Sequence, residues 1–243
     1  MKNSYFKNYT IAVVYACFSL FVVGNAIYGV VTENFVGLIY CLITLILFLV
    51  PYLAFIIFKF RFPPVLEISY LIFVVCAETL GSVDGFYELF WWWDILLHTM
   101  WGFICAAVGF YIFSVIIDRK KIPDKSPLLH CGFGLCFSLS TSMIWEFLEF
   151  GADTFFGMDV QKDTLLSQIH STALSSDGSV AYIKDITDVV INGERVISGG
   201  YLDIGLFDTI EDMFVGFAGA VLFFIISLIV SYRRKDSMKN LSK

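Results

Sequence analysis

Long apolar runs separated by short polar stretches dominate the sequence. A helix that crosses a bilayer needs roughly 20 mostly apolar residues. Six runs approach or exceed this length, and the predicted helices cover residues 9–31, 35–58, 64–81, 93–117, 127–150 and 207–232. The third run opens with Pro63-Pro64 and is interrupted by Glu67 and Glu78. The pattern predicts an all-α polytopic membrane protein, folded as one transmembrane domain over residues 1–243 with six helices in a bundle.

Residues 151–206 have the mixed composition of a water-exposed segment and separate the fifth predicted helix from the sixth. Two strand-like stretches, 189–191 and 194–197, flank Asn192-Gly193. Asn-Gly supplies the positive φ angles of a two-residue type I′ turn, so this pattern predicts a β-hairpin. A further turn at residues 176–179 precedes a strand-like stretch at 180–182. We expect either a structured surface insert or a lid over a site at the outer helix ends.

Composition and charge narrow the class of protein. Hydrophobic residues make up 58% of the chain and charged residues 16%, whereas soluble domains are nearer half apolar and a quarter charged. The net charge of −6 and the lack of a basic stripe argue against a nucleic-acid partner. All six cysteines lie in apolar runs without a CxxC pair. They are typical of small buried side chains, not of a disulfide framework or a zinc site.

The basic residues predict the orientation in the membrane. Thirteen of the 16 Lys and Arg residues flank the helices on one side, and Lys162, Lys184 and Arg195 all fall in the 151–206 insert. Because loops rich in Lys and Arg stay in the cytoplasm, this bias predicts cytoplasmic termini and an extracytoplasmic insert.

Acidic residues and one histidine recur at helical spacing in three of the predicted helices. The positions are Asp94 and His98, then Glu146, Glu149 and Asp153, then Asp208, Glu211 and Asp212. With alternating helix directions, all three groups fall in the outer half of the bundle, and Glu78 joins them. Ionisable groups at membrane depth are costly and normally face a cavity and a partner. No Lys or Arg occupies an outer helix half, so we expect protonated carboxyls, an imidazolium at His98, or a bound divalent cation.

A metal-site hypothesis assigns a role to seven of these residues. The predicted ligands are Asp94, His98, Glu149, Asp212 and Asp208, and the predicted catalytic residues are Glu146, as general base, and Asp153. Such a set suits Zn, Mn, Fe, Mg or Ca.

Structural alternatives remain open for several of them. Asp208 and Glu211 have the spacing of a helix capping box, and Asp94 is placed to interact with a helix dipole. His98 could be a hydrogen-bonded core residue, and Asp153 could be solvated at the membrane interface.

The motifs Asp94-x-x-x-His98, Trp145-Glu146-x-x-Glu149 and Asp208-Thr-x-x-Asp212, the last followed by glycines, resemble those of the VanZ-like membrane proteins. They are closer still to those of the YjdF-like bacterial inner-membrane family, over residues 93–220. The resemblance implies a bacterial cytoplasmic-membrane location. It places the family's polar positions on Asp94, His98, Glu146, Glu149, Asp208 and Asp212. The long insert and the second glutamate depart from the simpler VanZ-like pattern, and the resemblance implies no particular activity.

Three functions fit these observations. The first is a metal-assisted hydrolase or group transferase acting on a lipid-linked or phosphorylated substrate at the outer leaflet. The second is a transport or binding protein for a cation, a proton-coupled solute or a lipid headgroup. The third is a non-catalytic cell-envelope or antibiotic-resistance factor. All three imply membrane lipids as partners, and the first adds a lipid-linked cell-envelope substrate.

Overall fold

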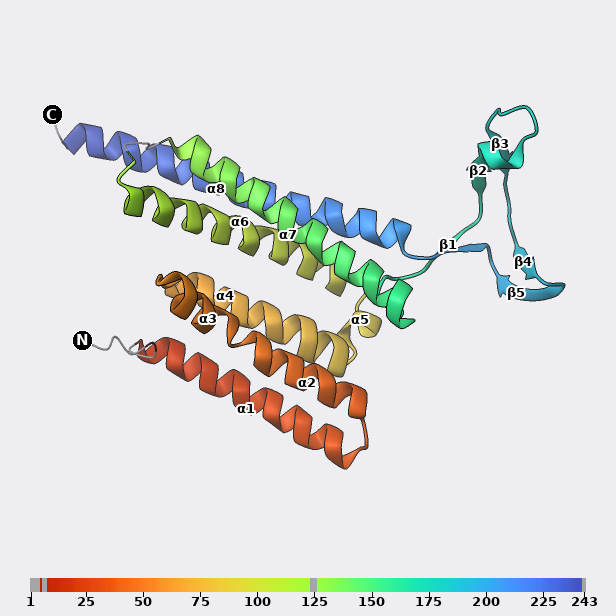
Figure 1. Cartoon of the computed structure of the whole chain (residues 1–243), viewed down its shortest axis with the longest axis horizontal. Coiled ribbons are helices and arrows are strands. Elements are labelled where there is room, and N and C mark those ends of the chain that lie inside the picture. The colour runs from red at the N-terminus through yellow and green to blue at the C-terminus, as the bar shows by residue number, and fades with distance from the viewer. Residues whose placement is uncertain (1–4, 6–7, 123–125, 242–243) are drawn as a thin grey trace. The chain divides into compact units, whose positions relative to one another are not determined.

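The computed structural model describes residue 5, residues 8–122 and residues 126–241, and it is mostly helical, as predicted (Figure 1). Within these residues, six helical stretches are long and apolar enough to cross a membrane. They are α1 (Tyr9–Val31), α2 (Phe35–Leu47) with α3 (Val50–Phe58), α4 (Pro64–Val74) with the π-helix η2 (Val75–Val83), α6 (Trp93–Lys120), α7 (Pro127–Phe156) and α8 (Leu206–Leu241). The single turn α5 (Phe86–Leu89) links η2 to α6.

The chain forms two compact units. Unit 1 comprises Met1–Ser142 and Val215–Lys243, and unit 2 comprises Met143–Phe214. The helices α7 and α8 each contribute residues to both units.

The core of unit 1 lies among α1, α2, α4 and η2. It contains six buried apolar residues, namely Val22, Cys41, Phe48, Leu71, Val74 and Val75. Other large apolar side chains of the spanning helices are exposed, such as Leu20 at 72% and Phe35 at 67%. In water such exposure would be unfavourable, but it is what the lipid-facing surface of a membrane bundle requires.

The predicted helix over residues 35–58 is interrupted at residues 48–49, between α2 and α3. Pro51 lies two residues further on, and a proline lacks the N–H that would pair with the carbonyl four residues earlier. That carbonyl belongs to Leu47, and it accepts a hydrogen bond of 3.1 Å from the Tyr70 hydroxyl of α4. A side chain from a neighbouring helix thus replaces the lost backbone hydrogen bond.

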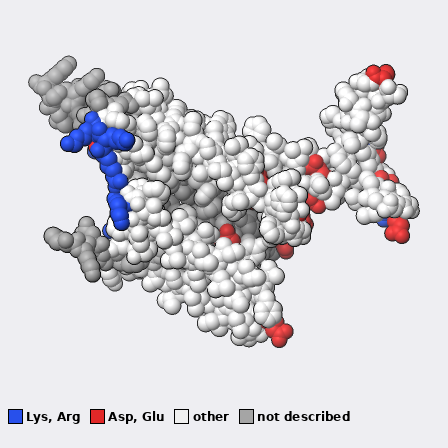
Figure 2. Space-filling view, in the orientation of Figure 1, with Lys and Arg blue, Asp and Glu red and all other residues white. Residues whose placement is uncertain are grey.

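Lys and Arg side chains gather at one end of unit 1 (Figure 2). Arg119, in the last turn of α6, donates to the carbonyls of Phe58, at 2.9 Å, and Lys59 at the end of α3. Tyr111 donates to the carbonyl of Arg61 over 2.6 Å. These contacts bring the basic segments after α3 and α6 together, and we call this the basic end. The prediction that it faces the cytoplasm stays a prediction.

The insert in unit 2 contains three two-stranded antiparallel sheets. β1 (Thr164–Leu166) pairs with β6 (Tyr201–Asp203), and between them lie the pair β2 (Ile169–Ser171) and β3 (Ala181–Ile183) and the pair β4 (Asp188–Ile191) and β5 (Glu194–Ser198). Asn192 and Gly193 both have positive φ, at 55° and 86°. The predicted Asn-Gly hairpin is therefore confirmed.

Candidate functional site

Three buried carboxylates meet in unit 2. Glu146 and Glu149 project from α7 and Asp212 from α8, with 5%, 9% and 4% of their surfaces exposed. One oxygen from each lies within 4.8 Å of the others. The i, i+3 spacing of the two glutamates places them on one face of α7, as the sequence predicts. We call Glu146, Glu149 and Asp212 the carboxylate cluster.

Trp145 orients one member of the cluster. Its indole Nε1 donates to Oε1 of Glu149 over 2.7 Å, across one helical turn. Such a hydrogen bond restricts the rotation of the carboxylate and stabilises its charge. The sequence contained the signal, because residues four apart on a helix are neighbours. The motif Trp145-Glu146-x-x-Glu149 predicted no role for Trp145 itself.

Asp153 binds the segment that follows α7. Its two carboxylate oxygens accept hydrogen bonds from the backbone N–H groups of Val160, at 2.7 Å, and Gln161, at 2.9 Å. The helix continues to Phe156, six residues beyond the predicted end, so Asp153 lies inside the last turn. This contact gives the aspartate a structural role, and its catalytic role stays a prediction.

Asp208 binds the same segment from α8, because its Oδ2 accepts from the Lys162 N–H over 2.9 Å. The Gln161 amide adds a hydrogen bond to the Thr209 hydroxyl. The helix begins at Leu206, so Asp208 is its third residue and not its N-cap. The capping-box alternative is therefore wrong. Together with Asp153, these contacts hold residues 160–162 between the end of α7 and the start of α8, one turn before Asp212. The ligand role of Asp208 stays a prediction.

The end of α7 and the insert that follows it in unit 2 carry several neighbouring acids. Partial desolvation and then the charges of Asp159, Asp153 and Asp203 raise the pKa of the Asp163 carboxyl. A raised carboxyl pKa beside other carboxylates indicates a negative local potential. Such a potential attracts cations to this part of unit 2.

Asp94 and His98 form a second pair, in unit 1. His98 Nε2 lies 3.6 Å from Asp94 Oδ1, and the two side chains are 15% and 14% exposed. The contact follows from their i, i+4 spacing in the first turns of α6. This pair belongs to unit 1 and the carboxylate cluster to unit 2. That the two groups bind one cation stays a prediction.

Glu67, predicted only to interrupt the third apolar run, is a buried acid near the basic end. Glu67 is 1% exposed, and its Oε1 accepts a 2.6 Å hydrogen bond from the Tyr5 hydroxyl. Burial, followed by this hydrogen bond and the neighbouring Tyr15, raises the pKa of Tyr5. Arg61 lies over the Tyr5 ring, 4.8 Å from its centroid. The sequence contained a signal for this buried acid, because Glu67 is a carboxylate in the first turn of an apolar helix.

The chain matches a known family over most of its length. A family model described as "Predicted membrane protein (DUF2238)" matches residues 10–234. No curated protein and no solved structure matches the chain.

Proposed function

The chain belongs to the DUF2238 family of predicted membrane proteins, and from this premise we propose that it is a metal-assisted membrane enzyme. The proposed reaction is hydrolysis or group transfer on a lipid-linked or phosphorylated substrate. The observation that carries the proposal is the carboxylate cluster, with three nearly inaccessible acids within 4.8 Å of one another.

The electrostatics of the cluster support a bound cation. Two unit charges 4.8 Å apart repel by roughly 3.5 kcal/mol at an effective dielectric constant of about 20. Three charged carboxylates make three such pairs. A divalent cation among them turns this repulsion into attraction, and the acidic residues around Asp163 raise its local concentration.

The donor set of the cluster favours a hard cation. Glu146, Glu149 and Asp212 offer oxygen atoms only, which suit Mg²⁺, Mn²⁺ and Ca²⁺. Zn²⁺ or Fe²⁺ would call for nitrogen, and the sequence-based prediction assigns that role to His98. Trp145 contributes by holding Glu149 in one orientation, as partners of metal ligands commonly do.

In the proposed reaction each acid has a different role. A bound cation would polarise a phosphoryl or acyl oxygen and lower the pKa of a water molecule. Glu149 and Asp212 would hold the cation, and Glu146 would accept the proton of the attacking water as general base. Asp153 and Asp208 keep residues 160–162 in place beside the cluster. With the predicted orientation, the site opens to the outer leaflet of the bacterial cytoplasmic membrane.

Metal analysis of the purified protein tests the proposal. We expect about one divalent ion per chain, measured by elemental analysis and by Mn²⁺ titration followed by electron paramagnetic resonance. Glu149→Gln and Asp212→Asn should weaken Mn²⁺ binding at least tenfold, and Trp145→Phe by roughly tenfold. Glu211→Gln is the matched control, because Glu211 is exposed and adjacent to Asp212 on α8. Wild-type protein without a stoichiometric ion, or equal affinity in the Glu149 and Glu211 variants, would refute the metal site.

Glu67 favours a second candidate, transport or binding of a cation. Its Oε2 is buried and has no hydrogen-bond partner among the described residues. A carboxylate in this state within a spanning helix is typical of ion and proton pathways. Cation flux into proteoliposomes tests this alternative: wild type should show flux and Glu67→Gln should lose it, whereas an enzyme with a one-sided site shows none in either protein.

A further inference from the structure

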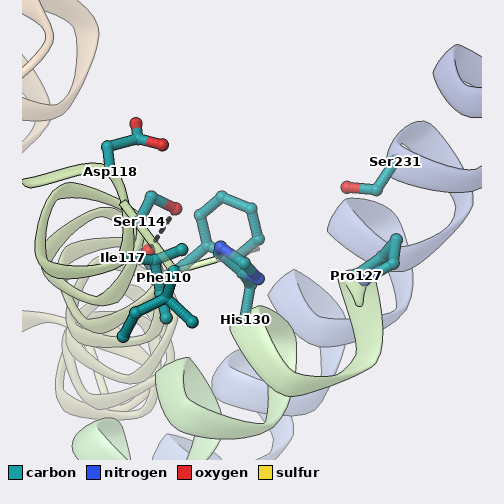
Figure 3. A pocket seen from close by; sticks show the side chains of 8 residues that line it. Phe110, Ser114, Ile117, Asp118, Pro127, His130 and Ser231 are labelled. Atoms are coloured by element: carbon teal, nitrogen blue, oxygen red, sulfur yellow. Dashed lines mark hydrogen bonds between the residues drawn. The ribbon is translucent and has the colours of Figure 1, made fainter. Parts of the chain in front are cut away.

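A pocket of about 330 Å³ opens in unit 1 between the end of α6, the start of α7 and α8 (Figure 3). Its volume is at the lower end of the range for small-ligand sites, roughly 300 to 1,000 Å³. Phe110, Ile117 and Pro127 form an apolar wall. Ser114, Asp118, His130 and Ser231 bring polar groups to the same space. None of them belongs to the carboxylate cluster.

Two of these polar side chains have protein partners. Ser114 donates its hydroxyl to the Phe110 carbonyl over 2.8 Å. His130 Nδ1 lies 3.0 Å from the Ser126 carbonyl oxygen. Because a carbonyl only accepts, this contact places the imidazole proton on Nδ1, and in the neutral ring Nε2 is then the acceptor. The His130 ring itself packs against Phe110, with centroids 5.6 Å apart.

The other two polar groups are available to a ligand. The Asp118 carboxylate and the Ser231 hydroxyl make no hydrogen bond or ion pair with residues in the described part of the chain. Figure 3 shows the Ser231 hydroxyl pointing from α8 toward the side of the pocket that carries Phe110 and His130. The pocket therefore offers two acceptors, at Asp118 and His130, and one hydroxyl that can donate.

Cationic residues flank this pocket. Arg119 and Lys120 follow Asp118 directly in the last turn of α6, and Arg233 and Arg234 come two and three residues after Ser231 on α8. Arg119 belongs to the basic end, where Lys and Arg side chains gather (Figure 2). One carboxylate among several cations is complementary to a ligand that carries a positive and a negative group together.

We propose that this pocket binds the headgroup of phosphatidylethanolamine. The ends of spanning helices lie at headgroup level, so a phospholipid is the molecule most abundant at this position. Its ammonium group would donate to Asp118 and His130 Nε2, and its phosphate oxygens would accept from Ser231 and the flanking cations. Phosphatidylcholine lacks the ammonium N–H donors, and phosphatidylglycerol lacks the positive charge. Recognition should therefore distinguish among the three lipids.

Lipid titration of the delipidated full-length protein tests this site. Phosphatidylethanolamine, phosphatidylcholine and phosphatidylglycerol with identical acyl chains are added in detergent, and bound lipid is counted by native mass spectrometry. We expect phosphatidylethanolamine to bind at least about tenfold more tightly than the other two, the size of one charge-assisted hydrogen bond. Asp118→Asn should remove this preference, and Ser231→Ala should weaken binding of all three lipids.

A control variant and a second pocket variant complete the test. Asp177→Asn changes an exposed acid in the insert and should leave the preference intact. His130→Gln removes the imidazole and gives the same test if Asp118→Asn does not fold. Equal binding of the three lipids by wild type overturns the proposal. So does a preference for phosphatidylglycerol, which would mark a general anionic-lipid surface, or an unchanged preference in both the Asp118 and the His130 variants.

Discussion

Gly102 lies where α6 and α8 pack backbone against backbone in unit 1, and its substitution by alanine tests this packing. A Cβ added at Gly102 would lie 1.9 Å from the carbonyl oxygen of Gly216 and 2.7 Å from its carbonyl carbon. The same contact recurs one turn further along α8, where a Cβ at Gly219 would lie 2.0 Å from the Thr99 carbonyl oxygen. Backbone atoms on both sides leave no flexible side chain to move away.

The size of the effect follows from this geometry. Carbon–oxygen contacts between helices are normally about 3.3 to 3.6 Å, so α6 and α8 would have to separate by more than about 1 Å. Van der Waals packing is a main driving force for helix association in lipid. Overpacking costs typically 1–3 kcal/mol, and the better helix propensity of alanine returns up to about 1 kcal/mol. We expect Gly102→Ala to lower the free energy of unfolding by about 2 kcal/mol, and the Tm by roughly 5 °C.

Thermal unfolding of the purified protein in detergent, followed by circular dichroism, measures this change. Gly24→Ala in α1 is the matched control, since its Cβ would meet nothing within 4 Å. It makes the same chemical change in a helix and should keep or slightly raise the Tm. Gly216→Ala should be tolerated, because its Cβ would lie 3.5 Å from Ser142 Oγ. If Gly102→Ala is as stable as Gly24→Ala, the close approach of α6 and α8 is refuted.

Three further predictions concern other parts of the chain. Tyr70→Phe should destabilise the protein by about 1 kcal/mol in a chemical unfolding titration, because it leaves the Leu47 carbonyl without its donor; an unchanged midpoint would show that this hydrogen bond adds nothing. Hydrogen bonds, first from the Ser175 hydroxyl, hold the pKa of Asp177 well below its ordinary value. The turn should therefore keep this stabilisation above the ordinary carboxyl pKa and lose it only as pH falls through the lowered pKa. In an NMR titration Ser175→Ala should move the Asp177 pKa upward. An unmoved pKa would show that the Ser175 hydroxyl is not what lowers it. Gly193→Ala places a side chain at a φ of 86° and should weaken the β4–β5 hairpin by about 1 kcal/mol, seen as faster amide hydrogen exchange in these strands alone.

Much of the fold follows from local patterns. The apolar runs predict all six spans, and residues 189–197 predict a hairpin that the structure confirms. The observed helix boundaries differ from the predicted ones in two places. The 35–58 helix is interrupted near Pro51, where Tyr70 takes over a backbone hydrogen bond. The third span ends in a π-helix that reaches Val83. Pro51 is a local signal for the interruption, whereas nothing in the local pattern of apolar residues signals the π-helix.

The candidate site was predictable in part. Helical spacing correctly places Glu146 and Glu149 on one face of α7 and Asp94 beside His98 on α6. The spacing does not distinguish the buried acids from those that bind backbone N–H groups. Asp153 belongs to the second kind, because its partners lie in a loop whose path the sequence pattern does not reveal.

Local patterns in the sequence are enough to predict six helices long and apolar enough to cross a membrane, the position of the hairpin in the insert, and which residues of one helix share a face. These properties depend on apolar length and on geometry within a few residues. Packing between distant segments places Asp212 beside Glu146 and Glu149, while the neighbouring Asp208 binds the Lys162 N–H. The burial of a carboxylate and the donor it meets depend on contacts between segments more than 40 residues apart, which no local pattern encodes.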